Sequence, residues 1–240
     1  MRLGCGRRGL LLASTSLAAL LGGGVPSAFA GCPVTQNGGT VATVGNASPA
    51  GTCILVENGA NVTGNVANSG VLTANGGAAP SGTGITITNS TVGGTVTNSG
   101  AINAKAQGIL IENNASVFGG ISNSGTISAS LYGAIIGGST ASTTIATFGG
   151  GITNSGTISS ANRAAIAVGG GLLSASNSIA VSNFSGGISN SGTLSGPAIA
   201  VIIGGEAEKT ATITVSTFSG GITNSATGLI QGGDAILVGG

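Results

Sequence analysis

One short pattern recurs along this chain of 240 residues and limits what it can fold into. The pattern Gly-Ile-(Ser/Thr)-Asn-Ser-Gly-Thr-(Ile/Leu)-Ser occupies residues 120–128, 151–159 and 187–195. Related copies centre on Asn68, Asn98 and Asn224, and the steps between successive asparagines are 30, 25, 31, 36 and 34 residues. A period of this length is typical of solenoids, in which each repeat buries its apolar face only against its neighbours.

Two further elements keep phase with this pattern. One is a strand of small and branched residues closed by two glycines, at 134–138, 165–170, 198–205 and 235–240. The other is rich in Ile, Val and Thr and ends in Phe, at 144–148, 179–184 and 212–218. All are bounded by turn residues, and no stretch after residue 30 has a sustained helical period. The sequence therefore predicts an all-β, three-sided parallel β-solenoid with three strands per coil and about 4.8 Å between coils.

Two residue types are predicted to stack inside this solenoid. Asparagines at one corner of every coil can form a ladder of side-chain amide hydrogen bonds, and the glycine of each Asn-Ser-Gly triplet tolerates the positive φ of a tight corner. The predicted ladder consists of Asn68, Asn98, Asn123, Asn154, Asn190 and Asn224. Four phenylalanines stand three or four residues before the Ile that opens each repeat. We expect them to form one aromatic column, with a ligand-stacking platform as the alternative; they are Phe118, Phe148, Phe184 and Phe218.

The first thirty residues have the composition of a secretory signal peptide. Three arginines precede an apolar run at 10–21, and Ala28-Phe29-Ala30 is a small-x-small cleavage site. The apolar run is too short for a membrane-spanning helix, which needs about 20 residues. We expect export and cleavage between Ala30 and Gly31.

The exported chain keeps two cysteines, Cys32 and Cys53. Such a pair is usually oxidised outside the cytosol, so a disulfide is predicted, and it would stabilise the first coil by about 3 kcal/mol. Because Phe29-Ala30-Gly31-Cys32 also resembles the box before a lipidated cysteine, lipidation of Cys32 stays open. The expected organisation is a signal peptide at 1–30, an N-terminal cap with the cysteine pair at 31–60, and solenoid repeats at 61–240.

Charged side chains are few. Residues 31–240 hold three basic and five acidic residues, too few basic ones to form a patch that binds nucleic acid. The chain has no His, which excludes His-based catalysis. Glu57 and Glu112 occupy equivalent places in related segments, and two carboxylates about 5 to 9.5 Å apart can cleave a glycosidic bond. We interpret them as a solvated corner pair because no Lys or Arg accompanies them. Glu206, Glu208 and Lys209 are predicted to lie in an exposed loop. No catalytic, cofactor-binding or metal-binding residue is predicted, and no cofactor.

The iterated Phe-Ser-Gly-Gly-Ile-Thr-Asn-Ser-Gly-Thr-Ile-Ser pattern, after a signal peptide and a Cys-bearing start, resembles the passenger region of bacterial autotransporters over residues 31–240. The resemblance implies a right-handed parallel β-helix and an outer-membrane β-barrel translocator as partner. No segment of this chain resembles such a barrel. The last repeat stops before its Phe strand, so we expect a fragment or the product of a truncated or split gene.

Three classes of function follow from these observations. The preferred one is a non-enzymatic, passenger-like protein that serves adhesion or cell-surface presentation toward a host or cell-surface ligand. The alternatives are a polysaccharide-active β-helix enzyme and a truncated passenger without function. The expected location is the cell surface, the outer membrane or the medium, or the periplasm if no translocator is present. We also expect self-association, because the open end of the solenoid exposes strand edges.

Overall fold

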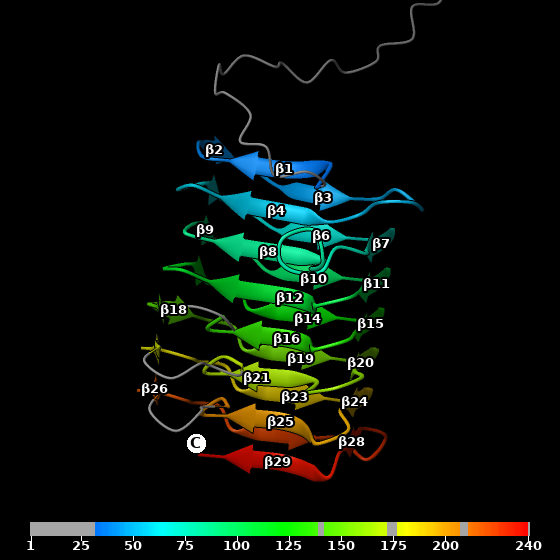
Figure 1. The fold of residues 1–240 in the computed structure, drawn as a ribbon, viewed down its shortest axis with the longest axis vertical. Coiled ribbons are helices and arrows are strands. Elements are labelled where there is room, and N and C mark those ends of the chain that lie inside the picture. The colour runs from blue at the N-terminus through cyan, green and yellow to red at the C-terminus, as the bar shows by residue number, and fades with distance from the viewer. Residues whose placement is uncertain (1–31, 139–141, 172–176, 207–210, 240) are drawn as a thin grey trace, which may run out of the picture.

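The computed structural model describes residues 32–138, 142–171, 177–206 and 211–239. The strand pairs are parallel and stack in register, so each coil of the chain lies on the one before it (Figure 1). In Figure 1 the strands in front run to the left and those behind run to the right as the chain descends, which makes the coil right-handed. This is the hand that parallel crossovers adopt. The predicted right-handed parallel β-helix is confirmed, whereas the predicted signal peptide and its cleavage site at Ala30 and Gly31 lie outside the described residues.

The largest sheet, sheet A, faces the viewer in Figure 1 and contributes one strand to every coil. Its strands contain the small and branched residues that the sequence places before the paired glycines. In order of stacking they are β1 (Val34–Asn37), β4 (Ile54–Glu57), β8 (Ile85–Thr88), β12 (Gln107–Glu112), β16 (Tyr132–Ile136), β21 (Ile166–Val168), β25 (Ile199–Ile203) and β29 (Asp234–Val238).

Three further sheets complete the early coils. Sheet B holds β2 (Thr40–Val41), β5 (Asn61–Val62), β9 (Thr91–Val92), β13 (Ser116–Val117) and β18 (Thr147–Phe148). Sheet C holds β3 (Val44–Asn46), β6 (Val66–Asn68), β10 (Val96–Asn98), β14 (Ile121–Asn123), β19 (Ile152–Asn154), β23 (Ile188–Asn190) and β27 (Ile222–Asn224). Sheet D holds β7 (Val71–Ala74), β11 (Ala101–Ala104), β15 (Thr126–Ala129), β20 (Thr157–Ser160), β24 (Thr193–Ser195) and β28 (Leu229–Gln231).

The coil is divided more finely than the three strands predicted. The Asn-Ser-Gly corner separates the two halves of the main pattern into different sheets, C and D, and a two-residue strand of sheet B precedes them. The later coils add a fifth sheet, E, between sheets A and B. It holds β17 (Thr143–Ile145), β22 (Ser178–Val181) and β26 (Thr212–Val215). These strands contain the β-branched residues that precede each later Phe.

The core consists of columns of identical or similar side chains. Alternate residues of each strand point inward, as strand geometry requires, and each meets its counterpart one coil away. Sheet C stacks Val96, Ile121 and Ile152, and sheet D stacks Ile102 and Ile127; all five are at most 2 % exposed. Stacking is therefore the source of burial for each repeat, as expected of a solenoid.

The asparagine ladder is continuous along sheet C. Each side-chain Nδ2 donates to the Oδ1 of the asparagine in the next coil, over 2.7 to 2.9 Å, from Asn46 to Asn224. Each internal Nδ2 also lies near a backbone carbonyl of its own corner and one of the next, as Asn68 does with Gly70 and Ala101 at 3.2 Å. All six predicted ladder residues are present. The ladder starts one coil earlier than predicted, at Asn46. The prediction missed this residue because Asn46 stands before Ala47 and not in an Asn-Ser-Gly triplet.

Glycine is required at the Asn-Ser-Gly corners for a different reason from the one predicted. Their backbone does not have a positive φ. Instead, a Cβ on Gly100 would overlap the carbonyl oxygen of Gly70 one coil away, and a Cβ on Gly125 would overlap that of Gly100. Close stacking of the coils at this corner, not backbone conformation, therefore requires glycine.

The aromatic column contains three of the four predicted phenylalanines. The rings of Phe148, Phe184 and Phe218 stack at centroid separations of 4.9 Å with interplanar angles of 14° and 16°. Phe118 is 52 % exposed, so its predicted place in the column is wrong. In the register of sheet B, Val117 is the partner of Phe148 and occupies the inward position. Phe118 follows it by one residue and, because side chains alternate along a strand, points outward.

The predicted disulfide between Cys32 and Cys53 is confirmed. It has an S–S distance of 2.01 Å and a Cα–Cα distance of 4.8 Å, and it ties Cys32, two residues before β1, to the residue directly before β4. Cys53 is fully buried. Since lipidation would use the same Cys32 sulfur, a disulfide-bonded Cys32 cannot also carry a lipid.

Candidate functional site

Sheet A is apolar on both faces in the middle of the solenoid. While Ile109 and Ile111 point into the main core, Leu110 between them points outward and heads a column with Ile135, Ala167 and Ile202. The members of this column are at most 1 % exposed, and with Tyr132 and Ala164 they form a second apolar cluster. In this region the outer face of sheet A is therefore packed and apolar rather than exposed to solvent.

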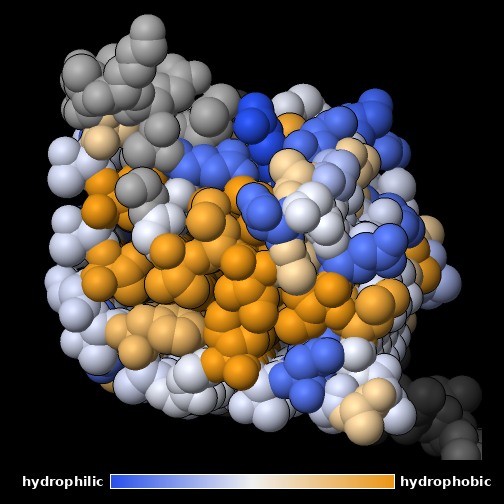
Figure 2. Space-filling view, turned by 90° about the horizontal axis from the view of Figure 1, so that it is seen from below, coloured by the Kyte–Doolittle hydropathy of each residue, from blue (hydrophilic) through white to orange (hydrophobic). Residues whose placement is uncertain are grey.

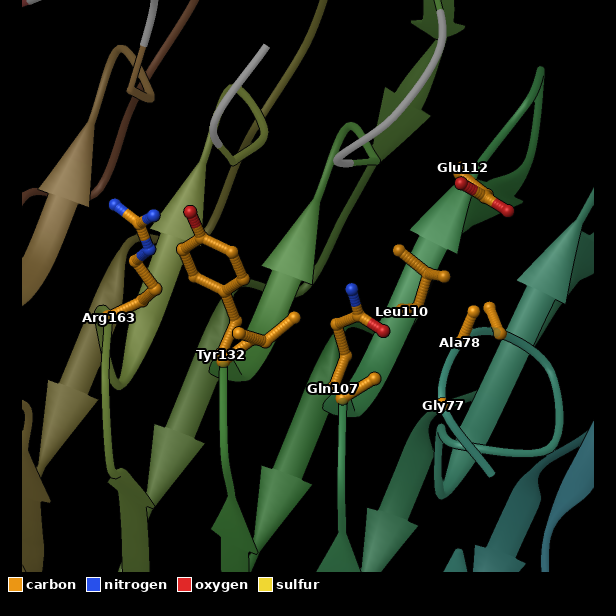
Figure 3. A pocket seen from close by; sticks show the side chains of 10 residues that line it. Gly77, Ala78, Gln107, Leu110, Glu112, Tyr132 and Arg163 are labelled. Carbon is orange, nitrogen blue, oxygen red and sulfur yellow. The ribbon is translucent and has the colours of Figure 1, made fainter. Parts of the chain in front are cut away.

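A cavity of about 380 Å³ lies over this face (Figure 3). It extends across neighbouring coils, from the segment between β7 and β8 to the segment before β21. Its lining is Gly77, Ala78, Ala79, Ala106, Gln107, Leu110, Glu112, Leu131, Tyr132 and Arg163. The volume falls within the range of about 300 to 1,000 Å³ that is usual for small-molecule sites.

One wall of the cavity is the loop between β7 and β8. Its backbone is bonded across itself, from Gly82 N to Ala78 O at 2.6 Å and from Thr83 N to Pro80 O at 3.0 Å. The buried Thr83 hydroxyl donates to Gln107 Oε1 at 2.8 Å, which ties the loop to β12. The wall is therefore held in place without a ligand.

Two polar side chains stand next to each other at the start of β12 and β16. Gln107 and Tyr132 are register partners, and Figure 3 shows both projecting from the outer side of sheet A. Gly108 and Gly133 follow them at the corner, where a Cβ would overlap the core side chains of Ile127 and Ile158. These glycines allow the chain to turn so closely that the residue before each of them faces the cavity.

Residues far apart in the sequence meet at the next edge of the cavity. The Tyr132 hydroxyl donates to Glu206 Oε2 at 3.1 Å, and Arg163 Nη1 forms a salt bridge with the same oxygen at 3.4 Å. The Glu206 side chain is only 15 % exposed, so its predicted place in an exposed loop is wrong. The hydroxyl and the guanidinium hold it against sheet A; Glu208 and Lys209 lie outside the described residues.

Glu112 ends β12 and lines the cavity at the edge opposite the Arg163 pair. Burial raises the pKa of its carboxyl above the ordinary value of 4.5. Among the described residues no side chain donates a hydrogen bond or forms an ion pair with this carboxylate. Glu112 is therefore partly buried at the cavity edge rather than fully solvated as predicted.

Glu57, the equivalent residue two strands earlier, has a different environment. Glu112 is the register partner of Thr88, and the pairing of Val56 with Ile87 sets Glu57 on the other side of that threonine. Glu57 is 9 % exposed and accepts a hydrogen bond from Asn37 Nδ2 at 2.9 Å. It is not solvated as predicted, and it does not line the cavity.

The repeat pattern of the sequence did not mark Tyr132, Arg163 or Gln107 as site residues. A signal was present in the unequal repeat steps, because the step of 30 residues from Asn68 contains the loop that the following step of 25 lacks. The cavity combines an apolar floor with a few fixed polar groups, an arrangement suited to binding. Across the described ranges no group of three His, Cys, Asp or Glu could hold a metal ion, and no helix is long and apolar enough to cross a membrane.

Comparisons of this chain with protein-family models, with curated proteins and with solved structures find no match. Its fold and the geometry of its outer surface are therefore the basis for a functional assignment.

Proposed function

We propose that this protein is an exported, non-enzymatic β-solenoid that acts in the manner of an autotransporter passenger, by presenting its outer surface for contact with cells or with surface glycans. The observation that carries the proposal is the cavity over sheet A. It is a preformed hollow, and two of its polar side chains are held by residues outside its lining: Gln107 by Thr83, and Arg163 by Glu206.

The distribution of residue types supports presentation rather than chemistry. Inward positions are filled by Ile, Val, Phe and Asn, which stacking alone explains. Cys32 and Cys53 are joined in a disulfide, so neither is a nucleophile. No Ser or Thr stands beside a histidine base, since the chain has none.

Expression of the full chain in a diderm bacterium tests export and presentation together. We expect an intact mass that starts at Gly31, accessibility to protease added to whole cells or recovery from the medium, and adhesion of cells or beads that carry the protein. A mass that includes residues 1–30, with the protein in the cytosol, would exclude the proposal.

A second candidate function, cleavage of a polysaccharide, is favoured by one observation. Burial raises the pKa of Glu112 beside a ligand-sized cavity, and a carboxyl with a raised pKa can act as a general acid. Turnover of a polysaccharide that disappears in Glu112→Gln would establish this function instead of presentation.

Self-association is the proposed partnership of the C-terminal end face. Figure 2 views this end and shows a continuous apolar area. Leu229, Ile236, Leu237 and Val238 are 37 to 71 % exposed there, and the ring of Phe218 has a stacking partner on only one side among the described residues. We propose that a second copy pairs with these strand edges. Sedimentation velocity of the exported protein tests this, and a monomer at all concentrations would contradict it.

A further inference from the structure

We propose that the cavity over sheet A binds an amino sugar, whose ammonium group pairs with the carboxylate of Glu112. This inference deepens the proposed function and rests on it, because it names the class of surface glycan that the solenoid would contact.

The Glu112 carboxylate lies at the cavity edge, is partly buried, and accepts no hydrogen bond from the described side chains. A carboxylate in such a place is unfavourable unless a hydrogen-bond donor or a cation accompanies it. The ordinary solution inside a protein is a Lys or Arg side chain. Here that place is left to a ligand.

The charged side chains at the cavity do not balance one another. Arg163 is the cation that lines it, and Glu206 already neutralises this guanidinium across 3.4 Å. Glu112 therefore leaves the site with a net negative charge. Since charges interact more strongly where water is partly excluded, the site disfavours uronic acids and sulfated sugars and favours a positively charged ligand.

The remaining wall of the cavity combines apolar and polar groups. Leu110, Leu131 and Tyr132 form an apolar surface, and the Gln107 amide and the Arg163 guanidinium add polar groups beside it. A sugar ring has the matching combination of an apolar C–H face and a rim of hydroxyls. A lysine side chain of a protein partner is slender and lacks hydroxyls, so it would set bare methylenes against Gln107 and Arg163.

The cavity is small, and the loop over it is held in place by hydrogen bonds. About 380 Å³ accommodates a ligand of one or two rings rather than a folded partner. Because the loop over the cavity is bonded to itself and to Gln107, the site needs little ordering when a ligand enters. Preorganisation of this kind increases affinity.

Calorimetric titration of the exported full-length product with a matched series of β-1,4-linked dimers tests the proposal. The probes are the glucosamine dimer, its N-acetylated form and cellobiose, which differ only at the substituent on carbon 2. We expect the affinity of the glucosamine dimer to be at least about tenfold higher than that of the other two, because a close charge pair adds affinity of this size. Equal affinity for all three dimers would overturn the proposal, and so would tighter binding of a lysine-containing peptide.

Two variants and one control locate the site. Glu112→Gln removes the charge, and Ala78→Phe fills the cavity from an exposed loop position; both should reduce affinity for the glucosamine dimer about tenfold or more. Glu57→Gln is the matched control, because it makes the same change at the equivalent place outside the cavity. Circular dichroism establishes that each variant is folded. Binding that survives in both site variants would overturn the assignment.

The outcome can be separated from that of the proposed function. Mass analysis of the dimer after titration shows whether it is cleaved, and fractionation shows whether the protein is exported. An exported protein that adheres to cells but does not bind the glucosamine dimer retains the proposed function and loses this inference.

Discussion

Replacing Phe184 with Ala should be among the most destabilising single changes in the solenoid. Its ring is fully buried and stacks at 4.9 Å on Phe148 on one side and on Phe218 on the other. Truncation of a buried Phe costs about 3 to 5 kcal/mol, and each aromatic pair adds about 0.5 to 1.5 kcal/mol beyond area burial. Because two ring pairs are lost at once, we expect a loss of at least about 4 kcal/mol in the free energy of unfolding.

Phe118→Ala provides the matched control. It removes the same side chain from the same sheet region, but this ring is 52 % exposed and outside the column. We expect a loss of less than about 1 kcal/mol, as for most surface changes. The two variants therefore differ in the register of one residue, not in chemistry.

Urea unfolding followed by far-ultraviolet circular dichroism measures both changes, with the fluorescence of the single tyrosine, Tyr132, as a second probe. Coincident transitions would show that unfolding is two-state. Separate transitions would show that the coils unfold independently, and the effect of each change would then appear in the free energy of unfolding of the coils around Phe184. A loss below about 1 kcal/mol in Phe184→Ala, or equal losses in the two variants, would refute the stacked column.

Further perturbations test other parts of the structure. Asn154→Ala should destabilise by about 2 to 4 kcal/mol in urea unfolding, because it removes a buried rung and leaves the amide of Asn123 without its acceptor; a loss below about 0.5 kcal/mol would show that the ladder contributes little. Cys53→Ser should lower the free energy of unfolding by about 3 kcal/mol, and free thiols in the exported protein would contradict the disulfide. Since burial raises the pKa of Glu112, the folded state holds its proton to higher pH than the unfolded state does. Stability should therefore fall as pH rises from 4.5 through the raised pKa, relative to Glu112→Gln. Parallel pH profiles for the two proteins would exclude this burial.

Much of this fold follows from local sequence. Strand composition between turn residues, together with a period near thirty residues, is enough to predict parallel stacking, because a repeat of that length can bury its apolar side only against its own copies. The asparagine ladder follows for the same reason: identical residues at identical corners must meet. The pairing of Cys32 with Cys53 needed only the expectation of export and the absence of another cysteine after residue 30.

Register and loop packing, in contrast, were decided by the tertiary structure. The sequence does not distinguish Phe118 from Phe148 by composition; a shift of one residue relative to Val117 turns one ring outward, since strand side chains alternate. The corner glycines are required by contact with the coil above, which no single repeat contains. Tyr132, Arg163 and Glu206 come from three different coils, separated by segments of unequal length. Their meeting beside Glu112 depends on how those segments fold over sheet A, and a repeat pattern determines the stack but not what covers its outer face.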